Sequence, residues 1–94
     1  MKHYIKEGAH YSFTLGDSRE YIAKCIKVPS DDVVLFDKPA IVLLNGEGKV
    51  EIVPATLTGD IINPMIVPLS SIQTILPSHE NAVEAYSQIV EKTL

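Results

Sequence analysis

The sequence has few of the residues that build covalent or metal-held frameworks. Its 94 residues include one cysteine, Cys25, and no tryptophan. One cysteine cannot form a disulfide within the chain, and without a Cys-x-x-Cys pair the chain has no thiolate zinc site. This usage is typical of a reducing compartment. We therefore expect a cytoplasmic protein whose fold rests on its apolar core.

Positive charge and long apolar runs are also scarce. Eight basic side chains stand against twelve acidic ones, which gives a formal charge of −4. This balance argues against broad capture of nucleic acid, because such binding depends on lysines and arginines that displace counterions. The longest apolar runs, Val33–Phe36 and Ala40–Leu44, are far shorter than the roughly 20 residues that span a bilayer. We expect one soluble globular domain with no membrane partner.

What the chain does have is a series of short β-branched and aliphatic runs. Between residues 11 and 76 these runs are cut by turn residues at intervals typical of a small antiparallel sandwich or barrel. The predicted strands are Tyr11–Leu15, Tyr21–Val28, Val33–Asp37 with Ala40–Leu44, Val50–Leu57, Met65–Val67 and Ile72–Leu76. Lys38-Pro39 predicts a bulge or bend, since proline cannot donate to the ladder. Residues 1–10 form a separate N-terminal segment with no predicted helix.

Residues 77–94 read as a helical segment. Ser78 is a favourable N-cap, so we expect the helix to begin near His79. Val83, Tyr86 and Val90 recur at helical spacing and form one apolar stripe. We predict that the helix docks on the sheet through these three side chains.

The predicted strands are apolar on both faces. In an antiparallel sheet with one face in solvent, apolar and polar residues alternate along each strand. Three runs lack this alternation and are apolar at both odd and even positions: Val33–Phe36, Ile41–Leu44 and Met65–Val67. A helix of about four turns covers only one patch of such a sheet. A subunit interface would cover the rest, and a tight monomer with an irregular second layer is the alternative.

The sequence has few residue patterns that are typical of a catalytic site. The histidines lie in the terminal segments without metal-binding spacing: His3, His10 and His79. Asp31-Asp32 follows Pro-Ser and is typical of a turn. Cys25 lies within an alternating strand, as a buried small hydrophobe would. Gly46–Gly48 lacks the lysine and helix of a phosphate loop. We predict no enzyme activity, no metal and no cofactor.

Binding chemistry is slightly better represented. Arg19, Lys24 and Lys27 lie on or beside one strand and could form a basic strip for phosphates. Four aromatic residues precede or share that strand and could stack bases: Tyr4, Tyr11, Phe13 and Tyr21. The alternative, that these rings fill the core and the lysines face solvent, is the more frequent arrangement in small β proteins.

The order of strands and turns resembles the Sm-like family. Residues 13–37 (FTLGDSREYIAKCIKVPSDDVVLFD) are similar to the first Sm motif, and residues 65–75 (MIVPLSSIQTI) to the second. The resemblance implies a mainly β fold, a small bent five-stranded antiparallel β-barrel, here followed by a C-terminal α-helix. It also implies a homo-oligomeric ring of five to seven subunits. Phage-encoded Sm-like proteins are divergent enough to include such a sequence, so we expect a protein of this subgroup in the cytoplasm of an infected bacterial host.

The resemblance further implies single-stranded RNA as a partner. The acidic turn Asp31-Asp32 corresponds to the base-contacting turn of the family, and Ser70 and Ser71 lie in the turn of the second motif. Pro68-Leu69 stands where the family has a basic residue and glycine. The implied RNA site thus comprises both turns and the basic strip: Arg19, Lys24, Lys27, Asp31, Asp32, Ser70 and Ser71. The acidic composition favours the alternative, a structural or protein-interaction ring without nucleic acid.

Overall fold

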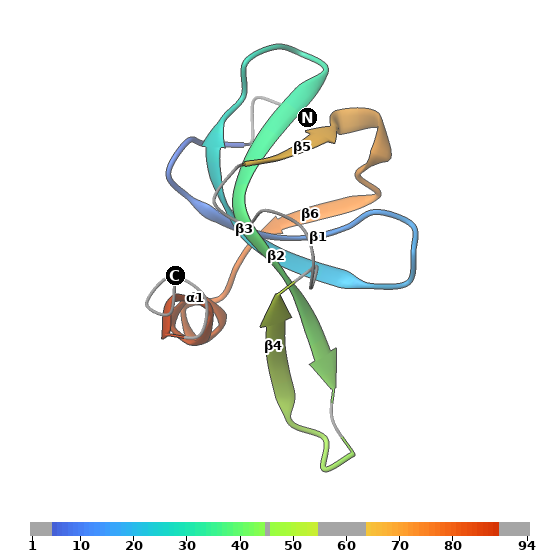
Figure 1. Ribbon diagram of the computed structural model, residues 1–94, viewed down its shortest axis with the longest axis vertical. Helices are drawn as coiled ribbons and strands as arrows, with labels where there is room; N and C mark the ends of the chain where they lie inside the picture. The colour runs from blue at the N-terminus through green and yellow to red at the C-terminus, as the bar shows by residue number, and fades with distance from the viewer. Residues whose placement is uncertain (1–4, 45, 55–63, 89–94) are drawn as a thin grey trace.

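The computed structural model describes residues 5–44, 46–54 and 64–88 and is mainly β (Figure 1). Its elements, in chain order, are β1 (His10–Thr14), β2 (Glu20–Lys27), β3 (Val33–Leu44), β4 (Val50–Pro54), β5 (Met65–Pro68), the 3-10 turn η2 (Leu69–Ser71), β6 (Thr74–Pro77) and α1 (Glu80–Tyr86). The predicted mainly β fold with a C-terminal helix is confirmed. No helix among the described residues is long and apolar enough to cross a bilayer.

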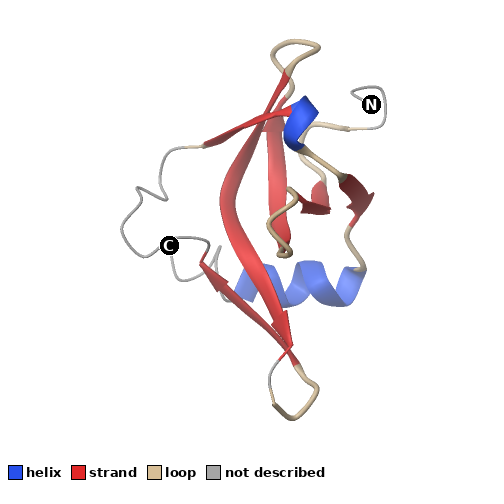
Figure 2. Ribbon diagram, turned by 90° about the vertical axis from the view of Figure 1, so that its right-hand side faces the viewer, coloured by secondary structure: helices blue, strands red, loops and turns tan. Residues whose placement is uncertain are grey.

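All strand pairs are antiparallel, and β3 pairs with three other strands, β2, β4 and β5. The order is β4-β3-β2-β1-β6, with β5 paired to the first half of β3. The sheet has six strands rather than the expected five, because β4 pairs with Ala40–Leu44 and β5 pairs separately with Val33–Phe36. Figure 2 shows β3 as one long curved ribbon through the molecule. Over the described residues the sheet is not closed into a barrel.

The turn between β1 and β2 depends on a glycine. Gly16 has a φ of +88°, a left-handed conformation that side chains rarely adopt. A Cβ atom there would also lie 3.1 Å from Nε2 of Gln73. The Gly-Asp pair therefore ends β1 where the sequence predicts, within one residue.

The predicted irregularity at Lys38-Pro39 is confirmed as a bulge in β3. Ile22 pairs with Ala40 but Lys24 pairs with Asp37, so β3 carries one extra residue between these pairs. Lys38 takes a positive φ of 44°. A one-residue insertion exchanges the two faces of all that follows it. The bulge therefore explains, within a single chain, part of the reason why β3 is apolar at both odd and even positions.

The larger apolar cluster lies on the inner face of the curved sheet. Phe13 stacks on Phe36 with ring centroids 4.4 Å apart and on Tyr21 at 5.6 Å. The bulge brings Ile41 to this face, although Val34 and Phe36 precede it at the opposite parity. The other buried members are Ile5, Tyr11, Ala23, Cys25, Val67 and Ile72.

A smaller cluster on the outer face is covered by α1. Tyr86 is fully buried against Ile22, Ala40 and Ile52. Ala82 and Ala85, one turn apart on α1, and Val42 on β3 pack against this cluster. The predicted docking through Tyr86 is confirmed.

Two details of the predicted helix differ. Ser78 does not cap it: its Oγ lies 2.8 Å from Oγ of Ser12, and its N–H donates to the carbonyl of His10. Ser78 is therefore bonded to β1 rather than to the helix, and His79 is the N-cap residue. Val83 is half-buried outside the cluster, because α1 turns Ala82 and Ala85 toward the sheet instead. Val90 lies outside the described residues.

Candidate functional site

Two turns that are far apart in the sequence meet at one end of the sheet. The N–H of Leu69 donates to the carbonyl of Asp32 at 2.8 Å, beside the Val33–Pro68 pair. The β2–β3 turn with Asp31 and Asp32 therefore adjoins η2, which carries Ser70 and Ser71. The side chains of these two aspartates and two serines are exposed. The pairing brings the aspartates and the serines of the predicted site together.

The acidic turn also has the local bonding expected of an ordinary turn. The N–H of Asp32 donates to Oγ of Ser30 at 3.2 Å. Such a bond from a residue two positions earlier is typical of serine in turns. The turn is thus stabilised by its own side chains, and both carboxylates remain on the surface.

The three basic residues do not form one cluster. Lys27 ends β2 beside the acidic turn, whereas Arg19 precedes the opposite end of that strand. Because a strand rises about 3.3 Å per residue, the eight positions from Arg19 to Lys27 span roughly 26 Å. Lys24 is half-buried between His10 and Asp37 in the ladder. Of the three, Lys27 therefore lies beside the two adjoining turns, and Arg19 and Lys24 lie elsewhere on or beside the strand.

The aromatic residues of the first two strands do not offer free faces for bases. Tyr11, Phe13 and Tyr21 are all buried in the inner cluster. The alternative interpretation, in which these rings fill the core, is correct for all three. Tyr4 lies outside the described residues.

Cys25 is buried, as the strand pattern predicts. Burial is the main cause that raises the pKa of its thiol, with a smaller contribution from the carboxylate of Glu7. A raised pKa keeps the thiol protonated, and a protonated thiol is a poor nucleophile. Within residues 5–44, 46–54 and 64–88, no three His, Cys, Asp or Glu side chains lie together as a metal site would require.

A polar pair that sequence reasoning missed lies at the β1–β2 turn. The hydroxyl of Tyr21 donates a short hydrogen bond to the carboxylate of Asp17. This bond is the main cause that lowers the pKa of Asp17. Burial, followed by the same carboxylate, raises the pKa of Tyr21. A tyrosine four residues after a turn aspartate was the available signal, and the pair anchors the turn to the core.

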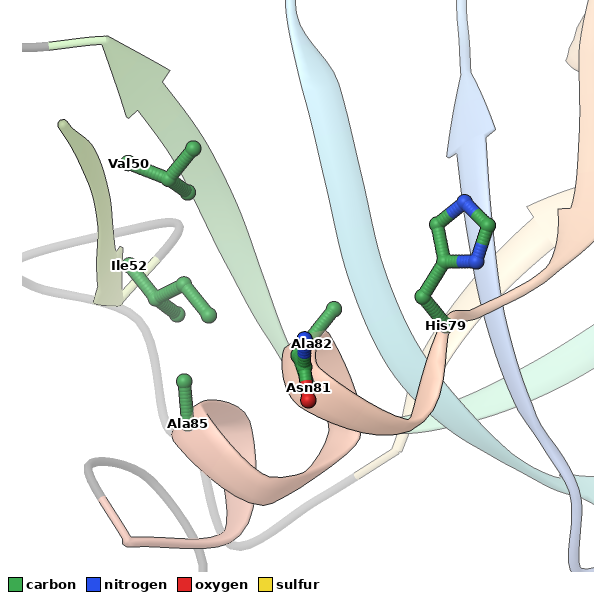
Figure 3. Close-up of a pocket in the computed structure, with 6 residues that line it drawn as sticks. All are labelled: Val50, Ile52, His79, Asn81, Ala82 and Ala85. Atoms are coloured by element: carbon green, nitrogen blue, oxygen red, sulfur yellow. The ribbon is translucent and has the colours of Figure 1, made fainter. Parts of the chain in front are cut away.

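An apolar pocket of about 330 Å³ opens between β4 and α1. Figure 3 shows its wall of Val50 and Ile52 facing Ala82 and Ala85, with His79 and Asn81 as its polar members. Val50 and its ladder partner Leu44 are 62% and 73% exposed. The outer cluster therefore continues into an apolar surface that the described part of α1 does not cover. Sequence reasoning missed this pocket, because it joins two distant elements.

Comparisons of the chain with protein-family models, with curated proteins and with solved structures found no match.

Proposed function

We propose that the protein is a non-enzymatic Sm-like module that assembles into a ring of five to seven copies through the open edges of its sheet. The observation that carries this proposal is the exposure of large aliphatic residues on two edge strands. Ile66 on β5 is 69% exposed, and Leu76 on β6 is 63% exposed. Unpaired edges with apolar side chains are templates for pairing with another chain.

Edge pairing would also complete the open sheet. In the described residues, β5 pairs only with β3, and β6 pairs only with β1. A head-to-tail contact between β5 of one copy and β6 of the next repeats around a ring, and the edges disappear when the rotation closes. The sheets of neighbouring copies would then be joined edge to edge, as the Sm-like resemblance implies. Pro68 lacks a backbone donor, so we expect a short intersubunit ladder.

Light scattering tests the assembly directly. The unaltered chain should have the mass of five to seven copies at micromolar concentration, and Ile66→Lys or Leu76→Lys should give monomers. Leu44→Lys is the matched control, because Leu44 is equally exposed but lies on the β3–β4 hairpin. A monomeric unaltered chain would remove the ring from the proposal.

For a ligand, we propose single-stranded RNA on the adjoining turns. The hydrogen bond between Leu69 and Asp32 supports this choice, because it brings Asp31, Asp32, Ser70 and Ser71 to one surface. Carboxylate and hydroxyl oxygens can accept hydrogen bonds from base edges, and Lys27 can contact a phosphate at the same end of β2. A ring repeats this set in every copy, so that weak contacts with one strand add together.

A protein-interaction ring in the cytoplasm is the second candidate, and the charge distribution favours it. Arg19 lies at the far end of β2, and Lys24 faces Asp37 in the ladder. With a net charge of −4 per copy, a ring repels phosphate at distances within the Debye length of about 8 Å. A partner protein with a basic surface would be attracted by the same field.

Fluorescence anisotropy separates the two candidates. Uridine-rich and adenosine-rich single strands are titrated at two salt concentrations. RNA binding predicts submicromolar affinity that weakens with salt and falls in Lys27→Ala, because Lys27 is the basic residue beside the adjoining turns. Arg19→Ala serves as the control, because Arg19 lies outside the adjoining turns. The absence of binding at low salt would reject RNA and leave the protein-interaction ring.

A further inference from the structure

The buried side of α1 carries one polar group, and that group reaches the bulge in β3. The hydroxyl of Tyr86 lies 2.8 Å from the carbonyl oxygens of both Asp37 and Lys38. Tyr86 has no exposed surface, and His10 packs edge-on against its ring, with centroids 5.4 Å apart. A bulge interrupts the ladder, so its carbonyls need partners from elsewhere. The tyrosine hydroxyl supplies one.

The bulge is also a strained feature. Lys38 has a φ of 44°, a conformation that costs a non-glycine residue free energy and persists only where neighbouring contacts fix it. Pro39 follows it and is buried. Tyr86 is the contact from outside the sheet that touches both carbonyls of this segment.

The sequence after the bulge does not itself decide which face of the hairpin points inward. Ala40–Leu44 is apolar at every position, so a one-residue slip would replace one apolar set by another. Ile41 and Leu43 would turn to the outer face, and Val42 and Leu44 to the inner face. In the observed register, Ala40 pairs with Ile22, beneath Tyr86. The apolar pattern of these five residues therefore gives only a small difference in free energy between the two registers.

We propose that Tyr86 is a register lock: its hydroxyl holds the bulge at Lys38, and the docking of α1 thereby fixes the register of the β3–β4 hairpin. Release of α1 frees the bulge and permits the alternative register. The hairpin projects from the rest of the sheet with α1 at its base (Figure 1). The lock therefore couples the C-terminal helix to the orientation of the exposed apolar hairpin surface, which carries Leu44 and Val50.

Tyr86→Phe tests the lock, because it removes the hydroxyl and leaves the ring. By amide hydrogen exchange, we expect about tenfold faster exchange in Ala40–Leu44 and Val50–Val53, the effect of one lost hydrogen bond. Nuclear magnetic resonance spectra should show a second set of signals for these residues. Amides of β1 and β6 should keep their rates. Equal acceleration everywhere, or no change in the hairpin, would overturn the proposal.

Two further variants make the test specific. Tyr21→Phe removes another core hydroxyl, whose acceptor is Asp17 at the distant β1–β2 turn, and should leave the hairpin rates as they are. Lys38→Gly removes the free-energy cost of a positive φ at this position. The hairpin amides of the double variant Lys38→Gly, Tyr86→Phe should therefore exchange at least threefold more slowly than those of Tyr86→Phe alone. Failure of this rescue, or a hairpin effect of Tyr21→Phe equal to that of Tyr86→Phe, would contradict a lock at the bulge.

Discussion

The two faces of the sheet are stabilised in different ways. The inner cluster is built largely from strand residues, with stacked aromatic rings from β1, β2 and β3 at its centre. The outer cluster has four buried members, and the largest of them, Tyr86, comes from a helix of seven residues. Isolated helices of this length are unstable in water. The inner face is therefore intrinsic to the sheet, whereas the outer face depends on whether α1 is docked.

The largest effect should come from the inner face. Phe13→Ala removes the ring that stacks on both Phe36 and Tyr21. Such truncations cost about 3–5 kcal/mol, a large part of the stability of a small domain. Urea denaturation followed by circular dichroism should show an unfolded or nearly unfolded protein. A variant close to the original in stability would show that the stacked rings are not central.

Tyr86→Ala should have a smaller effect, confined to the outer face. The substitution removes a fully buried ring, but α1 can detach while the inner cluster remains packed. We expect a loss of about 2–4 kcal/mol in the free energy of unfolding, with apolar surface exposed at Ile22 and Ile52. Binding of a hydrophobic dye to the folded variant would report that surface. A loss larger than that of Phe13→Ala would reverse the proposed ranking of the two faces.

The smallest effect should be a pH dependence at the rim of the inner face. The hydrogen bond from Tyr21 keeps the pKa of Asp17 below its usual value of 3.8. Its stabilising contribution is thus present above pH 3.8 and is lost as the pH falls through the lower, folded-state pKa. Tyr21 has the opposite sign: its raised pKa gives a contribution that is present below pH 10.0 and is lost as the pH rises further.

Urea midpoints of the unaltered chain and of Tyr21→Phe measure this dependence. The difference between the two proteins should be constant near neutral pH and should shrink below pH 3.8. Asp17→Asn gives a second comparison, because it removes the titrating group and leaves a hydrogen-bond acceptor. A difference that does not change with pH would reject the linkage.

Sequence reasoning located the strands because local patterns determine them. Residues such as Gly16 and Pro39 interrupt strands for steric reasons that do not depend on the tertiary structure around them. The bulge was predictable from Lys38-Pro39, but its effect on side-chain parity depends on how β3 pairs with β2, so the sequence pointed to the helix and a subunit interface as the cover for the apolar residues of β3. Pairing information, which lies outside any local window, was needed to see that Ile41 and Phe36 share one face.

In the candidate site, too, some features follow from local sequence and others depend on the tertiary structure. The adjacency of the Asp31-Asp32 turn and η2 was implied by the family resemblance, and a tertiary hydrogen bond creates it. The separation of Arg19 from Lys27 follows from the length of β2, which the sequence indicated. The pocket beside α1 was not predictable, because the phase of a short helix decides which residues face β4.

The pairing of β1 with β6 has a consequence for folding kinetics. The β1–β2, β2–β3 and β3–β4 pairs join neighbours in the chain, whereas the hydroxyls of Ser12 and Ser78 meet across a separation of 66 residues. Closing so long a loop costs conformational entropy before the contacts between its ends stabilise the structure. We expect the meander from β1 to β4 to form first and β6 to add in a later, slower step. Until that step, the second edge of β1 stays open to other chains.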